Sequence, residues 1–540
     1  MKTTLRIGWI LLCLALALGA RCWNVRDVFL EGHIYFADGD CYSRMTRVRM
    51  IVEHPGMIVR HHDFENWPQG VTAHTTAPLD YLIAGLKGVL DVVFAILDPK
   101  HSSLLHGQTL DLAGALISPL LGVAGALFLA WWLEKFRVRF GSAALLFYAV
   151  SPILVHGTVL GRPDHQSLLM LTLTVALGAE LALARKAESP VDERRWGIVG
   201  GIAWGLSLWV SLYEPLILLA MTIGLWLVLD RKAFCSRQRL PGAVICLAIL
   251  LLSLVLEGWP VALPDAAMRG YFANWQHQIG ELSHLRPVQL FDWVGWWIVA
   301  SLVLLFLAWR QDRRALPLLV MLLVVTLLTL WQARWGYFLG IVFAWTLPWQ
   351  MQALRRGWAA WLFFVVGWWP ILQAWDARLF LDDLAQDQRT MKQAELVALR
   401  GLAEDAIGKE EGPFLASWWL SPEIAYWSRQ SGVAGSSHES LPGIVDTARF
   451  FLSSDPVSAA AILRKRPVHW VLADDASREI ETSRDLLGIA VPETPLATTL
   501  SDHPEDAPDF LVEWTGRAAV RRDGLRFYRL YEVDDAILPP

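Results

Sequence analysis

Two short acidic motifs carry the residue types that could do chemistry in this chain. Asp38 and Asp40 follow the first apolar run, and Asp164 and His165 lie in GRPDHQ, at the mouth of another. Carboxylate oxygens are preferred ligands of Mg²⁺ and Mn²⁺, and charged residues beside an apolar span are costly unless they have a function. The alternatives are a solvated turn at Asp38 and Asp40 and a helix N-cap at Asp164.

A cation and a pair of aromatic residues are further candidates. Arg334, in WQARWGYF, lies at the outer edge of two apolar runs. Such an arginine either extends to the membrane surface or binds an anion, because a guanidinium pairs bidentately with phosphate. Trp418 and Trp419 are followed by a polar loop with Gly432 and Gly435. Paired tryptophans usually belong to a core, but this loop leaves a binding edge open.

Residues 257–292 separate two apolar runs and contain Tyr271 and Trp275. A connection of about 35 residues is too long for a plain turn, and its aromatic residues argue against disorder. We therefore expect a binding loop or lid. A zinc site is disfavoured, because His277 and His284 lack a compact motif of Cys, His or Glu.

Apolar runs of about 17 to 25 residues must position these motifs, since that length crosses a hydrocarbon core of about 30 Å. The chain is 54% hydrophobic and only 18% charged, which excludes an ordinary soluble protein. We predict a polytopic α-helical membrane domain over residues 1–375 and a soluble domain over 376–540, whose strand, loop, helix and strand pattern is typical of an α/β fold. The predicted spans are the N-terminal run to Trp23 and residues 107–133, 140–158, 164–185, 196–212, 214–230, 240–257, 293–309, 315–331, 333–351 and 357–375.

The charges orient these spans. Residues 1–375 hold 24 acids and 30 bases (+6) and residues 376–540 hold 28 acids and 17 bases (−11), which sum to the net charge of −5. An inside N-terminus places every basic connection on the cytoplasmic side, as the positive-inside rule requires. The loops 24–106 and 257–292 and the C-terminal domain then lie outside. The modest net charge gives no reason to expect nucleic acid. The basic connections are 134–140, 184–196, 230–239, 309–314 and 353–357.

Two segments have alternative interpretations. Residues 1–23 fit a cleaved signal peptide or a retained helix; we favour the retained helix, because its apolar run is long and its cleavage site is poor. Residues 79–97 are apolar but contain Asp80, Lys87 and Asp91, so we predict an external amphipathic helix lying against the membrane. The five scattered cysteines offer neither a disulfide framework nor a thiolate metal site.

Taken in order, the motifs resemble those of the catalytic subunit of oligosaccharyltransferase, a metal-dependent member of the GT-C superfamily of membrane glycosyltransferases. The resemblance covers most of the chain, and the motifs all fall on the predicted external face. The family has thirteen spans, whereas the apolar runs here give about eleven, with the deficit between residues 186 and 257, so we expect about 11–13 spans. The similar segments are DGDCYSR (38–44), PQGVTAHTTAPLDYL (68–82), GRPDHQ (161–166), QIGE (278–281), QARWGYF (332–338) and SWWLSPEIAYWSRQSGVAGSSHES (417–440).

The resemblance implies transfer of a glycan from a polyprenyl-pyrophosphate donor to a protein or peptide acceptor, in the family to Asn of Asn-x-Ser/Thr. Asp40 and Asp164 would be ligands of Mg²⁺ or Mn²⁺, with Gln166 at the third ligand position. Arg334 would contact the donor pyrophosphate. Glu281 would lie near the acceptor nucleophile and orient or polarise it.

The acceptor would bind at Trp418, Trp419 and Leu420. Leu420 stands where the family has an aspartate, and it cannot accept a hydrogen bond from an acceptor hydroxyl, which puts recognition of Asn-x-Ser/Thr in doubt. Gln166 replaces a charged or histidine ligand, so we expect weaker metal binding.

Other functions stay open. A GT-C transferase using a polyprenyl-monophosphate sugar is the nearest alternative, and Arg334 argues against it. A transporter or flippase should show polar residues near mid-span or paired broken helices, whereas few charges lie deep in any run here and the acids gather at one face. A non-catalytic relative is supported only by Leu420 and Gln166. We expect a multi-pass protein of a bacterial inner membrane, with its site and C-terminal domain in the periplasm and lipid as a partner.

Overall fold

The computed structural model describes residues 3–72, 77–97, 108–185, 189–259, 261, 264–516 and 527–539. They form two compact units. The first comprises Met1–Phe29, Thr75–Pro260 and Glu281–Leu381, and the second comprises Leu30–His74, Val261–Gly280 and Asp382–Pro540. The predicted external loops 24–106 and 257–292 are therefore each divided between the units. Within these loops, residues 73–76, 98–106, 260, 262 and 263 lie outside the described residues.

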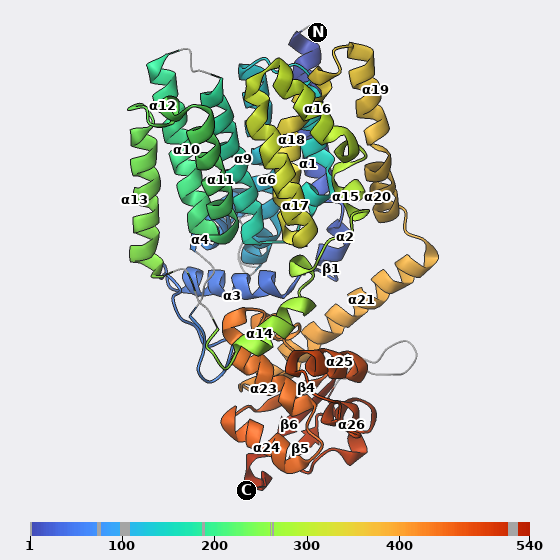
Figure 1. Cartoon of the computed structure of the whole chain (residues 1–540). Coiled ribbons are helices and arrows are strands. Elements are labelled where there is room, and N and C mark those ends of the chain that lie inside the picture. Colours follow the sequence, from blue (N-terminus) through green and yellow to red (C-terminus); the bar gives the residue numbers. More distant parts are fainter. Residues whose placement is uncertain are drawn as a thin grey trace. The chain divides into compact units, whose positions relative to one another are not determined.

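The first unit is a bundle of helices, in which a helix lies at each of the eleven predicted apolar runs (Figure 1). They are α1 (Thr3–Arg21), α6 (Thr109–Lys135), α7 (Gly141–Val150) with α8 (Pro152–His156), α9 (His165–Ala184), α10 (Pro190–Val210), α11 (Tyr213–Leu229), α13 (Leu240–Glu257), α16 (Trp297–Gln311), α17 (Leu316–Trp331), α18 (Gly336–Ala353) and α19 (Gly357–Gly367) with α20 (Trp369–Leu379). Shorter helices are α2 (Val25–Val28), α12 (Arg231–Phe234) and α15 (Gln289–Val294).

Six of the described helical segments are long and apolar enough to cross a membrane. The other five predicted spans are shorter, broken or less apolar, and their crossing stays a prediction. The run 140–158, for example, divides at Ser151-Pro152, because proline has no N–H to continue α7 but suits the first turn of α8. The six segments are Thr4–Val28, Thr109–Lys135, His165–Ala184, Leu240–Glu257, Arg313–Trp331 and Gly357–Leu379.

The N-terminal helix α1 is part of the bundle. Arg21, at its end, is fully buried, and its guanidinium Nε donates to Thr158 Oγ1 at 2.8 Å and its Nη1 to the Ala149 carbonyl at 2.9 Å. A buried charge is tolerated only with such partners. These contacts tie α1 to the segments before α9, and the retention of this helix stays a prediction.

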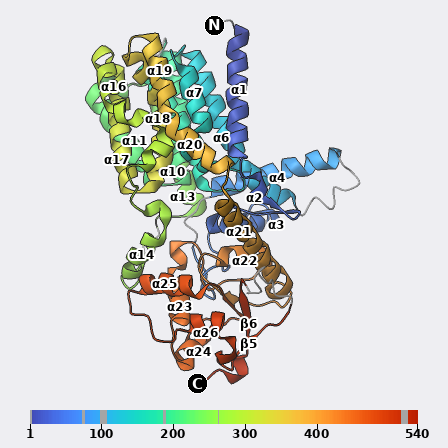
Figure 2. The ribbon, with the colours of Figure 1, turned by 90° about the vertical axis from the view of Figure 1, so that its right-hand side faces the viewer.

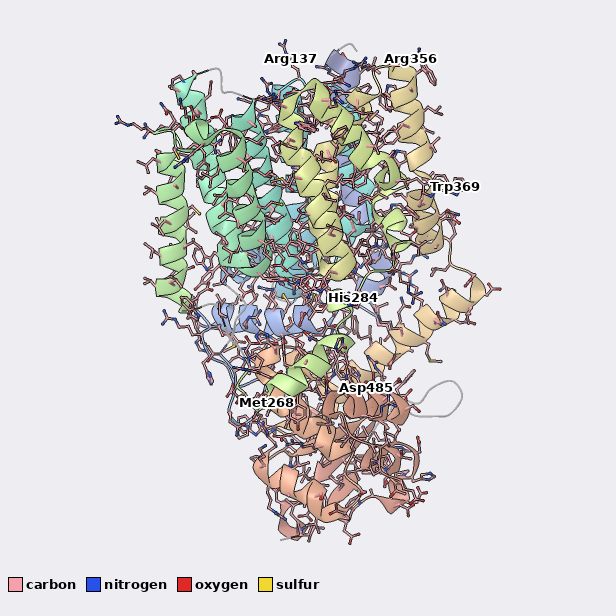
Figure 3. The ribbon with its side chains drawn as sticks, viewed as in Figure 1. Arg137, Met268, His284, Arg356, Trp369 and Asp485 are labelled. Carbon is pink, nitrogen blue, oxygen red and sulfur yellow. The ribbon has the colours of Figure 1, made fainter. Side chains whose placement is uncertain are left out.

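The basic connections and the chemically interesting turns lie at opposite ends of this bundle. Figure 3 shows Arg137 and Arg356 at one end and His284 at the other. At the second end, α4 (Ala77–Leu97) runs across the direction of α1 (Figure 2), and apolar side chains such as Val89, Ile96 and Leu97 are exposed along it. The predicted helix at 79–97 is therefore confirmed, and its position against a membrane stays a prediction.

The second unit contains a mixed four-stranded sheet in the order β3-β4-β6-β5, so the predicted α/β fold is confirmed. β3 and β4 are parallel, and β6 is antiparallel to both β4 and β5. Two details differ from the prediction: residues 421–428 form a helix rather than a loop, and the helical stretch before β4 is two helices. The elements are β3 (Phe414–Leu415), β4 (Trp470–Ala473), β5 (Leu511–Glu513), β6 (Arg529–Val533), α21 (Asp383–Leu402), α22 (Ser421–Ser428), α23 (Leu441–Phe451), α24 (Pro456–Lys465), α25 (Ala476–Leu487) and α26 (Leu496–Asp502).

Two segments distant in sequence complete this unit. α3 (Gly39–Glu53) packs on α22, where the rings of Tyr42 and Trp427 are 5.0 Å apart. α14 (Arg269–Trp275) packs on α25, where Asn274 Nδ2 donates to the Leu486 carbonyl at 3.0 Å. The aromatic part of the 257–292 loop is therefore an ordered part of the second unit, as its composition indicated.

Candidate active site

The turn before α9 is held firmly at the end of the bundle. Gly161 has φ +75°, a conformation that favours glycine, and its N–H donates to the Ala115 carbonyl of α6 at 3.0 Å. Ser118 Oγ donates to the Arg162 carbonyl. Asp164 is extended, and its Oδ1 accepts the His165 N–H at 2.6 Å, so Asp164 is the N-cap of α9. This cap fixes the carboxylate at the start of the helix.

Arg162 gathers three of the predicted site residues around its guanidinium. Its Nη2 lies 3.0 Å from Glu281 Oε1, 3.3 Å from Gln166 Oε1 and 3.8 Å from Asp164 Oδ2. Gln166 Nε2 donates to Glu281 Oε1 at 3.1 Å and to Oε2 at 2.9 Å. We refer to Arg162, Asp164, Gln166 and Glu281 as the Arg162 cluster. Residues more than 100 positions apart in sequence thus share one polar group at the end of an apolar bundle.

Two residues that the sequence analysis did not select complete this group. Tyr337 OH, at the start of α18, donates to Glu281 Oε1 at 3.1 Å. His156 lies with Nδ1 3.0 Å from Tyr337 OH and Nε2 3.0 Å from Arg162 Nη1. The sequence did offer a signal for them: like Asp164, His156 and Tyr337 are polar side chains at the ends of apolar runs.

Arg334 lies at the same end of the bundle and is already paired. Its Nη2 is 2.5 Å from Glu214 Oε1, and Glu214, in the first turn of α11, is 1% exposed. Ser211 Oγ donates to the other Glu214 oxygen at 2.6 Å. Arg334 also interacts electrostatically with Glu281 and Asp164. The cation predicted to bind phosphate therefore has a buried counter-ion, which the sequence analysis missed.

Asp40 belongs to the second unit. It is an exposed carboxylate in the first turn of α3, a helix that Asp38 caps by accepting the Cys41 N–H at 3.1 Å. A carboxylate in the first turn is stabilised by the helix dipole. The prediction that Asp40 acts with Asp164 rests on the sequence motif alone.

Trp418, Trp419 and Leu420 follow β3 and lie in a turn before α22. Trp418 and Trp419 are partly exposed, whereas Leu420 is 8% exposed. The two indole rings are 5.7 Å apart and nearly perpendicular. The Leu420 side chain therefore contributes to packing, and any polar recognition at this edge must come from other residues.

The carboxylate and amide oxygens of the Arg162 cluster are ligands that a divalent cation can use, but the Arg162 guanidinium competes for them. The described residues contain no group of three or more His, Cys, Asp or Glu side chains that could hold a metal. Asp164, Gln166 and Glu281 offer carboxylate and amide oxygens, which Mg²⁺ and Mn²⁺ prefer. Arg162, however, contacts Gln166 Oε1 and Glu281 Oε1, and His165 contacts Asp164 Oδ1. A cation would have to displace the guanidinium from these oxygens.

Comparisons with known proteins identify the fold. Neither a scan against protein-family models nor a search of curated proteins finds a match. Among solved structures, the chain resembles the Archaeoglobus fulgidus oligosaccharyltransferase tethered with an acceptor peptide containing the NVT sequon, at TM-score 0.64 and 13% identity over 100% of this chain and 75% of that one. A structure of the same enzyme with Zn and sulfate matches at TM-score 0.63 and 14% identity, over 98% and 74%. ArnT from Cupriavidus metallidurans, bound to undecaprenyl phosphate, matches at TM-score 0.53 and 13% identity, over 99% of both chains.

The chain has the GT-C fold. The resemblance that the motifs indicated is thereby confirmed for the fold, at an identity too low to extend to the activity. Within this GT-C bundle, Glu281 of the Arg162 cluster is three residues before His284, which lies at the end opposite Arg137 and Arg356 (Figure 3).

Proposed function

We propose that this GT-C protein is a membrane glycosyltransferase that moves a glycan from a polyprenyl-pyrophosphate donor to a protein or peptide acceptor, with Asn as the acceptor residue in the manner of oligosaccharyltransferase. The observation that carries the proposal is the Arg162 cluster, which lies beside Arg334 at one end of a lipid-embedded bundle. Two arginines and two carboxylates at the end of an apolar bundle fit a substrate with a charged phosphate head and an isoprenoid tail.

Arg334 and Glu281 would have different roles in the transfer reaction. In the transfer, the bond from the sugar to the phosphate oxygen breaks and a bond from the sugar to the acceptor nucleophile forms. The polyprenyl pyrophosphate leaves with the electron pair, and the acceptor's proton passes to solvent. Arg334 would stabilise the negative charge that develops on the leaving phosphate. Glu281, oriented by Gln166 and Tyr337, would accept a hydrogen bond from the acceptor and orient it.

A divalent cation, Mg²⁺ or Mn²⁺, is part of this proposal. Asp164 and Gln166 would hold it, and the sequence resemblance alone implies Asp40 as a further ligand. The cation would neutralise phosphate charge when bound. Because Gln166 contributes no charge and Arg162 competes for its oxygen, this metal would bind weakly.

Replacing Arg334 tests the assignment of the donor. Arg334→Ala removes the guanidinium and should lower transfer from a polyprenyl-pyrophosphate donor about 10- to 100-fold, since hydrogen bonds to charged groups contribute about 1.5–3 kcal/mol. Arg334→Lys should retain part of the activity. The measurement is transfer to an Asn-containing peptide by the purified protein. The matched control is Arg356→Ala, an exposed arginine at the other end of the bundle (Figure 3). Wild-type transfer by Arg334→Ala would exclude this role for Arg334.

A polyprenyl-monophosphate donor is the second candidate. The observation in its favour is the Glu214–Arg334 ion pair, which reduces the positive charge available to a doubly charged pyrophosphate. The same assay with both donors decides between them. Transfer from the monophosphate donor alone, lost in Arg334→Ala, would favour this candidate over the pyrophosphate donor.

We also propose the cellular setting from the charge pattern. The end of the bundle that carries the Arg162 cluster would face the periplasm of a bacterial inner membrane, and so would the second unit. The acceptor would bind along the edge formed by Trp418 and Trp419.

A further inference from the structure

A cavity of about 550 Å³ lies within the first unit, between α9, α11, α17 and α18. Binding pockets for small ligands are of about 300–1,000 Å³, mostly apolar, with a few polar groups. Leu177 is the residue of α9 that lines the cavity nearest in sequence to Asp164. The stretch of α9 from His165 to Leu177 rises about 18 Å, at about 1.5 Å per residue. The cavity is therefore distinct from the Arg162 cluster.

Charged residues mark the end of the bundle to which the cavity extends. Asp230 and Arg313, which line it, lie in two of the basic connections. Arg314, which also lines it, shares a small adjoining pocket with Val138. Val138 is the sequence neighbour of Arg137, which lies at the end of the bundle opposite His284 (Figure 3). This is the end predicted to face the cytoplasm.

Away from these charges, the lining is largely apolar. The lining residues of α9 run from Leu177 to Ala184 and those of α11 from Thr222 to Leu229, so each helix borders the cavity over about 10 Å. One leaflet of a bilayer has a hydrocarbon layer of about 15 Å, half of a core of about 30 Å. In depth and polarity, the cavity thus matches the space that a lipid chain of one leaflet fills. Its apolar lining residues include Leu181, Leu225, Leu318 and Met321.

Three of the charged lining residues are paired within the protein. Glu180 Oε2 accepts a hydrogen bond from Trp226 Nε1 at 2.7 Å and lies 3.5 Å from Arg239 Nη1. Asp312 Oδ1 lies 3.9 Å from Arg314 Nε. These charges compensate one another, so they provide no net attraction for a charged ligand.

The other two charged lining residues, Arg313 and Asp230, are exposed and form no ion pair with the residues that the structure describes. The Asp230 carboxylate accepts the Ala233 N–H at 3.0 Å, as the N-cap of α12. Asp230 also interacts electrostatically with Arg239, which Glu180 already pairs. One cation and one anion therefore lie at the charged end of an apolar cavity. A lipid head with one phosphate and one ammonium complements both charges, whereas an anionic head leaves Asp230 facing a like charge.

We propose that this cavity binds a phospholipid of the cytoplasmic leaflet whose head carries both a phosphate and a primary ammonium, as phosphatidylethanolamine does. An acyl chain enters between α9, α11 and α17 and supplies the dispersion contacts that an empty apolar space lacks. The phosphate accepts hydrogen bonds from Arg313, and the ammonium donates to Asp230. The proposal goes beyond glycan transfer, because it involves neither the donor nor the acceptor.

Lipid titrations of the full-length protein in detergent test the proposal. Native mass spectrometry gives a Kd for added palmitoyl-oleoyl phosphatidylethanolamine and for the anionic phosphatidylglycerol with the same chains. Wild type should bind the ethanolamine lipid about fivefold more tightly, because Asp230 disfavours a head without a cation. Arg313→Gln should weaken both lipids about fivefold, since both contain a phosphate. Asp230→Asn keeps the helix cap and should remove the preference between the lipids.

The apolar part of the site is tested by filling it. Leu225→Trp places a larger side chain in the cavity and should weaken both lipids about tenfold or more, since overfilled space excludes a chain. Leu227→Trp is the matched control, because Leu227 is an exposed residue of the same helix and does not line the cavity. Arg310→Gln is the control for charge, because Arg310 is an exposed arginine of the same basic connection as Arg313 and does not line the cavity. Both controls should bind lipid as wild type does.

Three results would overturn the proposal: equal Kd values for the two lipids in wild type, unchanged binding in Leu225→Trp, or equal weakening by Arg313→Gln and Arg310→Gln. Undecaprenyl phosphate separates a phospholipid site from a site for the donor's chain. Simultaneous binding of undecaprenyl phosphate and the ethanolamine lipid to wild type is the expected result. Displacement of the ethanolamine lipid would assign the cavity to the donor's chain and would also overturn the proposal.

Discussion

A single buried carboxyl, that of Glu423, makes the stability of the second unit depend on pH. Glu423, in α22, is 9% exposed, and burial raises its pKa from 4.5 to about 8, although Lys392 and Arg478 oppose the shift. The unfolded chain loses this proton near pH 4.5, so the folded state becomes less stable as the pH rises from about 4.5 to 8. We expect Glu423→Gln to gain about 1–3 kcal/mol over wild type at pH 8.5 and to differ little at pH 5. Thermal unfolding in detergent at both pH values measures this, with the exposed Glu411→Gln as control. An equal difference at the two pH values would contradict the assignment.

Pairs of helices show where the bundle is closest packed. A Cβ added at Gly201 of α10 would lie 2.0 Å from the Gly242 carbonyl oxygen of α13, so the two backbones meet without side chains between them. Gly201→Ala should therefore separate the helices and destabilise the first unit by about 1–3 kcal/mol. Gly224→Ala in α11 is the control, because a Cβ there meets nothing within 4 Å. The fraction of protein that stays monodisperse after heating measures both; equal loss in the two variants would refute close packing as the cause.

The predicted orientation of the molecule in the membrane can be tested by labelling one native cysteine, Cys235. Cys235 is exposed in the basic connection between α12 and α13, whereas Cys13 and Cys41 are buried. If basic connections face the cytoplasm, a membrane-impermeant maleimide should label Cys235 in inverted vesicles and leave it unlabelled in intact spheroplasts. A Val491→Cys variant, exposed in the second unit, should show the opposite pattern in a Cys235→Ser background. Labelling of Cys235 in intact spheroplasts would reverse the proposed topology.

The helices and the fold class could be predicted from the sequence, because hydrophobic runs and periodicity are local patterns. Eleven apolar runs became helices, and the α/β character of the tail was visible in its strand and helix patterns. The helix over 421–428 was missed, because the polar stretch that leads to Gly432 and Gly435 was predicted to be a loop. Segments 30–74 and 261–280 joined the second unit, which depends on contacts such as Tyr42 with Trp427 that no local pattern encodes.

For the candidate site too, some features could be predicted from the sequence and others came only from the tertiary structure. By itself, the sequence determined that Asp164, Gln166 and Arg334 stand at the ends of apolar runs, since a lipid environment confines polar residues to such places, and that Glu281 lies in the loop between two runs. Only the tertiary structure decided their partners: Arg162 and Tyr337 for Glu281, and Glu214 for Arg334. Hydrophobic periodicity places a residue along an element, but hydrogen bonds and ion pairs depend on which elements pack together. That packing is a property of the whole chain, and it also formed the cavity between α9, α11 and α17, which no local pattern encodes.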